Sequence, residues 1–332
     1  MKWGIVGAGD IVRKRIIDAI RSTIEAELLA ITRRNHGALA AFADEYSIPR
    51  RYPDLESMVS DPDIDAVYIA TPVAYHAEQT IVAARAGKHV LCEKPIAMDL
   101  AEADRMIHAC QSAGVTLGIA YYRRFYPVVQ RMSELILEGT IGSIAQARID
   151  AFEPFDPPPD HPRSWLLDPA TSGGGPMIDF GCHRIELLTA LFPRDEEAMG
   201  RPDASTVRAF LATSALRREV EDNAVAILRL GGNVLGTVSV SHSIGTPRDT
   251  LTIWGSRGSI HCPALNQGTL ELTVVEPDGS QQLETEHLPP HENLHQPLIA
   301  DFETAVAEGR EPTVDGATGR EVTAILDAIY RS

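Results

Sequence analysis

The 332-residue chain has 46 acidic and 30 basic residues, which gives a formal net charge of -16 at pH 7. This charge excludes a non-specific binder of nucleic acid or of anionic membrane surfaces, because like charges repel. Hydrophobic residues make up 44% and charged residues 23% of the sequence, as in globular proteins, and the length allows two domains with separate cores.

Cysteine usage and the start of the chain bear on its location. The cysteines are widely spaced without a CxxC pair, so we expect reduced thiols and neither a disulfide framework nor a zinc cluster. They are Cys92, Cys110, Cys182 and Cys262. A predicted strand begins at Lys2, which leaves no room for a signal peptide, and no stretch approaches the length of a membrane span. We therefore expect a cytoplasmic protein.

The first motif is WGIVGAGDIV, at residues 3–12. Lys2–Val6 has the apolar run of a buried strand, and Ile11–Ile20 has apolar residues at helical spacing. A glycine turn between strand and helix lets a pyrophosphate approach the backbone, and the N–H groups at the helix start favour negative charge. A structural turn is the alternative, since Val12 replaces the third glycine of the dinucleotide fingerprint. We expect the phosphates at Gly7, Gly9, Asp10 and Ile11.

The second predicted strand, Leu28–Ile31, ends at Thr32, Arg33 and Arg34. In dinucleotide-binding folds an acidic residue at this interval binds the ribose hydroxyls and repels a 2′-phosphate. A hydroxyl and two guanidinium groups would instead bind that phosphate or stack on adenine. The motif therefore predicts NADP as the cofactor, with NAD as the alternative; a solvated basic loop is the non-functional interpretation.

Strand and helix patterns continue to alternate up to residue 122. This predicts a doubly wound parallel sheet with helices on both faces and ligands beyond the carboxyl ends of its strands. Three loops fall at such ends: Thr71-Pro72-Val73 followed by His76, Glu93-Lys94-Pro95, and residues 121–127. The expected strands are Ala66–Ala70, His89–Cys92 and Val115–Ile119, and the expected helices are Leu39–Tyr46, Tyr75–Ala86 and Ala101–Ala113.

Glu93-Lys94-Pro95 is the most informative loop. The proline excludes the helical region for Lys94 and stiffens the loop, with a cis bond as one way to do so. Its ammonium would lie at the nicotinamide end of the cofactor, where it can orient a hydroxyl or stabilise charge on oxygen. The alternative is an ordinary surface lysine. We expect Thr71, Pro72, His76, Glu93 and Lys94 to contact the cofactor.

Residues 123–332 have a different pattern. Five segments alternate or are rich in β-branched residues, with Gly231-Gly232-Asn233 as a hairpin turn, which predicts an open, mostly antiparallel sheet. A Pro-rich acidic stretch, Glu153 to Asp160, predicts an exposed loop. Two amphipathic helices, Leu298–Ala307 and Thr318–Tyr330, end the chain. The five strands are Ile144–Phe152, Thr206–Leu216, Ala224–Leu230, Val234–Ser243 and Leu251–Trp254.

A helix is expected from Pro176 to about Leu191, after three glycines. Asp179 and His183 lie four residues apart on it and share one face. Histidine exchanges protons near neutral pH, and a carboxylate nearer the helix start stays ionised and can fix a hydroxyl or favour the imidazolium. A purely structural pair and a metal site are the alternatives; we expect no metal, because no second ligand pair is near and hydride transfer needs none.

Four motifs together resemble the Gfo/Idh/MocA family, that is, glucose-fructose oxidoreductase, inositol dehydrogenase and their relatives. They are GIVGAG near the start, AGKHVLCEKPIAMDLAEA at 86–103, YRRFYP at 122–127 and GGGPMIDFGCH at 173–183. The resemblance implies a Rossmann domain at 1–122 and an α+β domain at 123–332, with helices on one face of its sheet and the last helix packed on the first domain. In the family the other face of this sheet is commonly used for contacts between subunits, so the resemblance also implies a homodimer or homotetramer.

The resemblance also implies roles for residues. Lys94, Asp179 and His183 would be catalytic, Tyr122 and Trp165 would line the substrate site with them, and Arg123 would contact the cofactor. Two positions depart from the family pattern: Tyr122 stands where relatives often have Asn, and Leu166 where many have Arg. Arg163 could supply a displaced cation.

The sequence therefore predicts an NADP-dependent oxidoreductase that transfers hydride between the nicotinamide and a secondary alcohol or carbonyl of a sugar, cyclitol or related polyol. Whether Lys94 or His183 carries the proton stays open at this point. Two alternatives remain within the resemblance: a member that uses the cofactor transiently to cleave glycosides, and a cofactor-binding regulator without activity.

Overall fold

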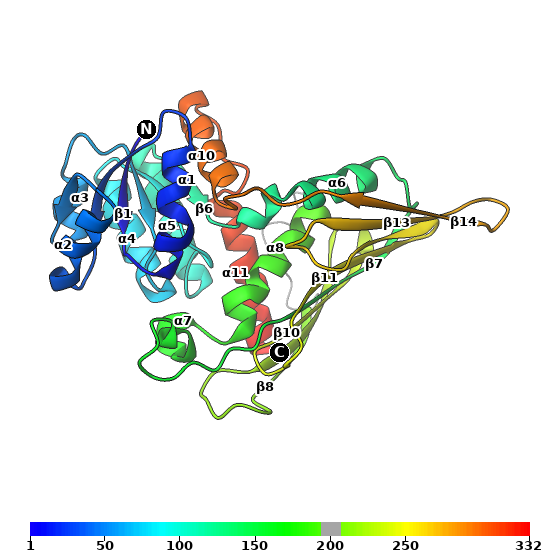
Figure 1. Cartoon of the computed structure of the whole chain (residues 1–332). Coiled ribbons are helices and arrows are strands. Elements are labelled where there is room, and N and C mark those ends of the chain that lie inside the picture. Colours follow the sequence, from blue (N-terminus) through cyan, green and yellow to red (C-terminus); the bar gives the residue numbers. More distant parts are fainter. Residues whose placement is uncertain (194–206) are drawn as a thin grey trace.

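The computed structural model describes residues 1–193 and 207–332 and contains two sheets side by side (Figure 1). The first six strands form one sheet and the last eight form the other. Helices α8 (Cys182–Leu191) and α11 (Gly316–Arg331) lie between the two sheets and contact each other. The fold is a Rossmann sheet followed by a mostly antiparallel sheet, as the sequence predicts.

The first sheet is parallel with strand order β3-β2-β1-β4-β5-β6. Its central strands are buried on both faces because helices cover them, which explains their continuous apolar runs. The strand order reverses at β1, so a crevice opens beyond the carboxyl ends of β1 and β4. The strands are β1 Lys2–Val6, β2 Glu27–Thr32, β3 Arg50–Tyr52, β4 Ala66–Ile69, β5 His89–Cys92 and β6 Leu117–Ile119.

Side-chain caps fix where the helices of this domain begin. Asn35, Asp54 and Asp99 each accept a hydrogen bond from the backbone N–H three residues on. The helix expected from Leu39 therefore begins at His36, because Asn35 caps it. The strand β3 and the helix α3 were not expected, since both are too short for a periodic pattern. The helices are α1 Ile17–Ser22, α2 His36–Glu45, α3 Leu55–Val59, α4 His76–Arg85 and α5 Leu100–Ala113.

The second sheet has the order β14-β13-β12-β11-β7-β10-β9-β8, and all neighbours are antiparallel except β7 and β10. Thr206, the first residue of one expected strand, lies outside the described residues. Of the rest, Val207–Ala212 is β8, and residues 213–216, which were expected to continue it, are not in a strand. The strands β12, β13 and β14 were not expected. The bounds are β7 Ile144–Phe152, β8 Val207–Ala212, β9 Asn223–Arg229, β10 Leu235–Ser241, β11 Arg248–Gly255, β12 Gly258–Cys262, β13 Thr269–Val275 and β14 Gln281–His287.

Helices lie on one face of this second sheet (Figure 1). They include α6 (Pro127–Leu137), which the sequence analysis did not predict, and α8. A short helix, α7 (Pro169–Ser172), precedes α8. The helix expected at 176–191 has a π-helical turn at Met177–Gly181 before α8 begins.

The end of the chain returns to the first sheet. Helix α10 (Gln296–Glu308) lies against α1, and Trp3 donates a hydrogen bond from its indole N–H to Glu303, 2.7 Å away. Helix α11 contacts both α5 and α8. Since α11 also contacts β6 of the first sheet and β8 of the second, it joins the two sheets. Within residues 1–193 and 207–332, no helix combines the length and the apolar character that a bilayer span requires.

Candidate active site

A cavity of about 1200 Å³ lies beyond the carboxyl ends of the first sheet and extends to the start of α8. The predicted strand-end loops, the glycine turn and the 176–191 segment all reach it. The predicted site residues that line it are Gly7, Gly9, Asp10, Ile11, Thr32, Arg33, Arg34, Thr71, Pro72, Glu93, Lys94, Tyr122, Arg123, Trp165, Asp179 and His183.

The glycine turn is shaped for a ligand that approaches the backbone. Gly7 has φ +94°, and a Cβ there would lie 2.8 Å from the carbonyl oxygen of Ala70. Gly9 has no neighbour within 4 Å of its Cβ position, so its backbone is open to the cavity. The first N–H groups of the following helix have no intrahelical partner. The turn therefore fits a pyrophosphate.

The helix after this turn differs from the prediction. Its first turns include a π-helical segment, Val12–Ile16, before α1 begins. Val12, in place of the third glycine, is fully buried. Asp10 lies beside the turn and forms an ion pair with Lys14 at 2.7 Å, which offsets a negative charge that would oppose a phosphate.

The basic segment after β2 lies at the same end of the sheet. Thr32 is buried, and its carbonyl accepts a hydrogen bond from the N–H of Gly7 at 2.9 Å. Arg33 is half-buried with its guanidinium 5.9 Å from the ring centre of Phe42, and Arg34 is exposed. Both line the cavity. A phosphate on the adenosine ribose would meet two guanidinium groups here.

The Glu93-Lys94-Pro95 loop contains a cis peptide bond between Lys94 and Pro95, one of the conformations that the sequence suggested. Glu93 accepts a hydrogen bond from the hydroxyl of Tyr68 at 2.8 Å, and burial raises the pKa of the Glu93 carboxyl. His76, for which we expected a cofactor contact, does not line the cavity. It is fully enclosed, with its ring nitrogens 3.0 Å from the carbonyl of Pro95 and 2.9 Å from that of Thr71. His76 thus joins the loop that contains Thr71 to the loop that contains Pro95, and both loops line the cavity.

Lys94 and Asp179 meet although 85 residues separate them. The ammonium of Lys94 donates a hydrogen bond to the backbone carbonyl of Asp179 and lies 4.0 Å from its carboxylate. Burial opposes the charge on Lys94, but Cys182, Asp179 and Glu93 outweigh it and raise its pKa. Burial also opposes the charge on Asp179, yet the contact with His242, whose Nε2 lies 3.4 Å from the carboxylate, and the charge of Lys94 bring its pKa to about 2. Both groups are therefore charged at neutral pH.

His183 lies at the start of α8 with its ring against two tyrosines. The ring centres of Tyr121 and Tyr122 are 5.5 Å and 5.0 Å away, and its buried Nδ1 has no hydrogen-bond partner in the part of the chain that the structure describes. Burial, followed by the positive charges of Lys94 and Arg123, holds the pKa of His183 well below its ordinary value. Asp179 therefore does not favour an imidazolium at His183, one of the two roles we expected for it; the imidazole is neutral at neutral pH.

Several residues at the site were not predicted. The guanidinium of Arg15 lies over the ring of Tyr122, 5.1 Å from its centre. The ring of His295 also packs against Tyr122, with the two ring centres 4.3 Å apart. Arg163, which the sequence suggested only as a displaced cation, lies 3.3 Å from the carboxylate of Asp179. The run Arg13-Lys14-Arg15 was the one available signal for Arg15. His295 follows a loop without a motif, so only the fold brings it here.

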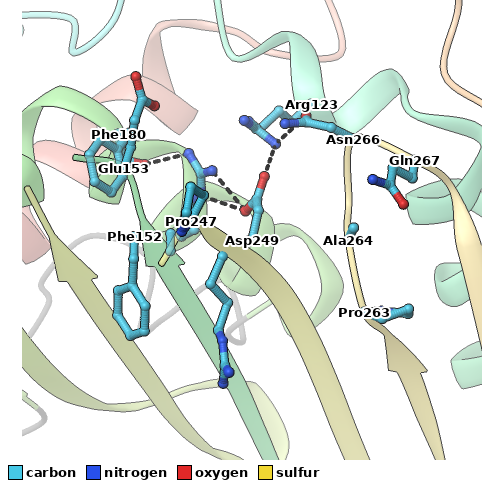
Figure 2. A pocket seen from close by; sticks show the side chains of 13 residues that line it. Arg123, Phe152, Glu153, Phe180, Pro247, Asp249, Pro263, Ala264, Asn266 and Gln267 are labelled. Atoms are coloured by element: carbon cyan, nitrogen blue, oxygen red, sulfur yellow. Dashed lines mark hydrogen bonds and ion pairs between the residues drawn. The ribbon is translucent and has the colours of Figure 1, made fainter. Parts of the chain in front are cut away.

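Arg123 lies at the border between this cavity and a second one of about 310 Å³ (Figure 2). We expected Arg123 to contact the cofactor. It lines the cavity, and its guanidinium also pairs with Asp249 at 2.9 Å and donates to Asn266 at 3.2 Å, while Arg184 holds the other oxygen of Asp249 at 2.7 Å. Among the residues that the structure describes, no group of three or more His, Cys, Asp or Glu side chains is arranged to hold a metal ion.

A phosphate-binding turn on a Rossmann sheet, joined to a pocket with an ammonium, a carboxylate and an imidazole, defines a dinucleotide-dependent oxidoreductase. The chain belongs to the Gfo/Idh/MocA family. The family model described as "Oxidoreductase family, NAD-binding Rossmann fold" matches residues 1–121, and the model of the GFO/IDH/MocA C-terminal domain matches residues 129–261. The protein is an NAD(P)-dependent oxidoreductase.

Curated relatives and solved structures of this family cover nearly the whole chain. The chain is 32% identical to 1,5-anhydro-D-fructose reductase of Ensifer adhaerens, over 96% of this chain and 92% of the relative. It is 31% identical to D-xylose 1-dehydrogenase (NADP(+)) 2 of Haloferax volcanii, over 100% and 97%. Aldose-aldose oxidoreductase of Caulobacter crescentus, solved with glycerol, has a TM-score of 0.85 at 26% identity, with 100% of this chain and 96% of that chain covered.

Proposed function

We propose that this protein is an NADP-dependent oxidoreductase that interconverts a secondary alcohol and a carbonyl on a sugar, cyclitol or related polyol. The observation that carries the proposal is that Lys94, Asp179 and His183 line one cavity together with the glycine turn. The relatives support the substrate class, because a sugar-derivative reductase, a xylose dehydrogenase and a myo-inositol 2-dehydrogenase are among them.

The charges of the three side chains support a division of roles. When bound, the nicotinamide ring accepts a hydride from the carbinol carbon in oxidation or donates one to the carbonyl carbon in reduction. In oxidation, neutral His183 takes the hydroxyl proton, and Lys94, which keeps its charge, stabilises the developing negative charge on oxygen. Asp179 accepts a hydrogen bond from a hydroxyl and so orients the substrate. In reduction the same groups act in reverse.

The preference for NADP is supported by Thr32, Arg33 and Arg34 at the end of β2, since this segment itself has no carboxylate to repel a 2′-phosphate. An NADP-using xylose dehydrogenase is among the relatives, although levoglucosan dehydrogenase, with a TM-score of 0.88 at 25% identity, was solved with NADH and levoglucosan. Arg33 and Arg34 therefore decide our choice of NADP over NAD. The cofactor contacts we propose are those of the glycine turn, of the basic segment and of the loops at 71–72 and 93–94.

The second sheet supports a homo-oligomer. Its face opposite the helices has a row of exposed apolar side chains in register across neighbouring strands, since Leu235 pairs with Gln146 and Gln146 with Trp254. We call this row and its neighbours the outer face: Phe210, Val225, Ile227, Leu235, Trp254 and Leu283. Exposed apolar surface of this kind is typical of an interface, and a second copy of the chain is the occupant we propose. We also retain the cytoplasm as the predicted location.

The function is tested by titration of the purified protein with NADPH and NADH, followed by a panel of aldoses, ketoses, cyclitols and dihydrodiols read at the nicotinamide absorbance band. We expect tighter binding of NADPH and stoichiometric change of the cofactor with at least one polyol or its carbonyl. K94A should bind cofactor but lose turnover, because the cation is absent from the reacting oxygen.

Two results would favour the alternatives. Cleavage of a glycoside without net change in free cofactor would indicate transient redox chemistry. NADPH binding without turnover over the whole panel would indicate a regulator that uses the fold to sense the cofactor.

A further inference from the structure

His242 lies directly behind the Asp179 carboxylate and outside the cavity. It follows the last residue of β10, is only 2% exposed, and has no motif around it in the sequence. Its ring packs between Phe155 and Phe180, with ring centres 5.1 Å and 5.3 Å away. The imidazole therefore has one fixed orientation.

Hydrogen bonding fixes the position of the proton on this ring. Arg218 approaches Nδ1 of His242 with a guanidinium nitrogen at 2.8 Å. A guanidinium group only donates, so Nδ1 accepts and the imidazole proton is on Nε2. Arg218 is itself held by the carbonyl of Phe155 at 3.0 Å and that of Glu221 at 2.9 Å. The arrangement leaves Nε2–H as a donor, and it lies 3.4 Å from Oδ2 of Asp179.

We propose that His242, oriented by Arg218, is a positioning residue of the reaction, because its Nε2–H holds the Asp179 carboxylate in the orientation that faces Lys94 and the substrate. The inference rests on the proposed function and assigns a role to a residue that touches neither substrate nor cofactor. A carboxylate at a catalytic centre orients the reacting hydroxyl only if its free oxygen points at that hydroxyl, and a donor behind the carboxylate supplies that constraint.

The charged groups that face Asp179 come from three segments. Lys94 is on the loop after β5, Arg163 is on the loop before the 3-10 turn Ser164–Leu167, and His242 follows β10. Arg163 is half-buried and also lies 3.9 Å from Glu153, so it is a weaker constraint than the enclosed His242. Burial opposes the charge of Asp179, and the contact with His242 at 3.4 Å is the largest effect that lowers its pKa in return.

Two variants of His242 separate its contact with Asp179 from its contact with Arg218. H242Q places an amide N–H near the position of Nε2 and keeps the donor to Asp179. H242N places its oxygen near the position of Nδ1, keeps an acceptor for Arg218, and loses the donor. H261N serves as a matched control, since His261 is a half-buried histidine of β12 bonded to Thr252.

We expect H242N to lower kcat about tenfold or more, the effect of one lost hydrogen bond to a charged group, and H242Q to stay within about threefold of the unmodified protein. The acid limb of the kcat profile should move to higher pH in H242N only, because Asp179 loses a donor that stabilises its charge. Binding of NADPH should be unchanged in all three variants. Equal losses in H242N and H242Q, or no loss in H242N, would overturn the inference.

A second readout needs no substrate. NMR of protein labelled with ¹⁵N-histidine, with H242N used for assignment, reports which ring nitrogen carries the proton. We expect a proton on Nε2 and none on Nδ1, which accepts from Arg218; a proton on Nδ1 would contradict the inference. A protein without turnover would thus refute the proposed function, and the position of this proton would still decide the inference.

Discussion

His183 is the residue whose protonation the site constrains most strongly. Burial and the neighbouring cations hold its pKa well below the ordinary value, so the unfolded chain takes up the proton at a higher pH than the native protein. Stability associated with His183 is therefore complete above about pH 6.5 and falls as the pH decreases toward the native pKa. The loss amounts to about 1.4 kcal/mol for each pH unit in that window.

H183N removes this titration, so its stability relative to the unmodified protein should improve by about 1.4 kcal/mol between pH 7.5 and pH 5.5. Urea unfolding at the two pH values measures the difference. H108N is the control, because His108 is exposed on α5 and its replacement should leave the pH dependence unchanged. An equal response of both variants would mean that His183 is not held neutral by its surroundings. Turnover should be lost in H183N at either pH.

Local patterns and the resemblance together marked Lys94, Asp179 and His183, which the structure brings to one cavity. The proline after Lys94 and the helical spacing of Asp179 and His183 drew attention to them, and the resemblance supplied their roles. His242 and His295 could not be found in this way. Each lies next to the site because distant elements fold together, and neither belongs to a pattern that a local chemical argument can interpret. For Arg123 the motif suggested a cofactor contact, which stays a prediction, and the ion pair with Asp249 was not predicted.

At the scale of an element, the end of β2 carries the choice of cofactor. We expect R33A and R34A each to weaken NADPH binding by about tenfold or more, since each removes a charged hydrogen-bond donor from a phosphate. Binding of NADH should change by less than about threefold, because it lacks the 2′-phosphate. Fluorescence titration with the two cofactors measures both effects.

The control for this pair is R51A on β3, an exposed arginine that pairs with Asp44 at 3.2 Å and does not line the cavity. It should leave both affinities unchanged and thereby show that the loss is not a general effect of net charge. Parallel losses of NADPH and NADH in R33A would instead mean that the guanidinium stacks on adenine, the other role that the sequence allowed.

The two π-helical turns illustrate what helical periodicity cannot predict. Continuous helices were expected over 11–20 and 176–191, and each has a π turn at the end that meets the cavity, Val12–Ile16 and Met177–Gly181. A π turn has no residue signature of its own, because the wider hydrogen-bonding pattern is imposed by packing. Such turns are frequent at functional sites, and the second one sets how Asp179 lies relative to His183.

At the scale of the molecule, the order of strands and helices was predictable and the join between the halves was not. Alternating strand and helix patterns are sufficient for a doubly wound sheet, and β-branched alternation for the second sheet. The parallel pairing of β7 with β10, and the position of α11 between α5 and α8, depend on contacts across more than 80 residues. We expected the last helix near the first domain from the resemblance, not from its own amphipathic pattern.

The outer face of the second sheet gives a prediction for the whole assembly. Ile227 and Leu235 are 51% and 46% exposed on neighbouring antiparallel strands, and their side chains share that face. If a second copy covers it, I227K/L235K places two charges in a dry interface and should shift the protein to monomer, because an unpaired buried charge costs several kcal/mol. Light scattering after size exclusion measures the mass of each species.

L137K, which adds a charge at an 84% exposed leucine on α6, is the matched control and should keep the mass of the unmodified protein. Since the active-site residues come from one chain, the monomeric variant should still bind NADPH; a monomeric unmodified protein would remove the outer face as an interface between copies.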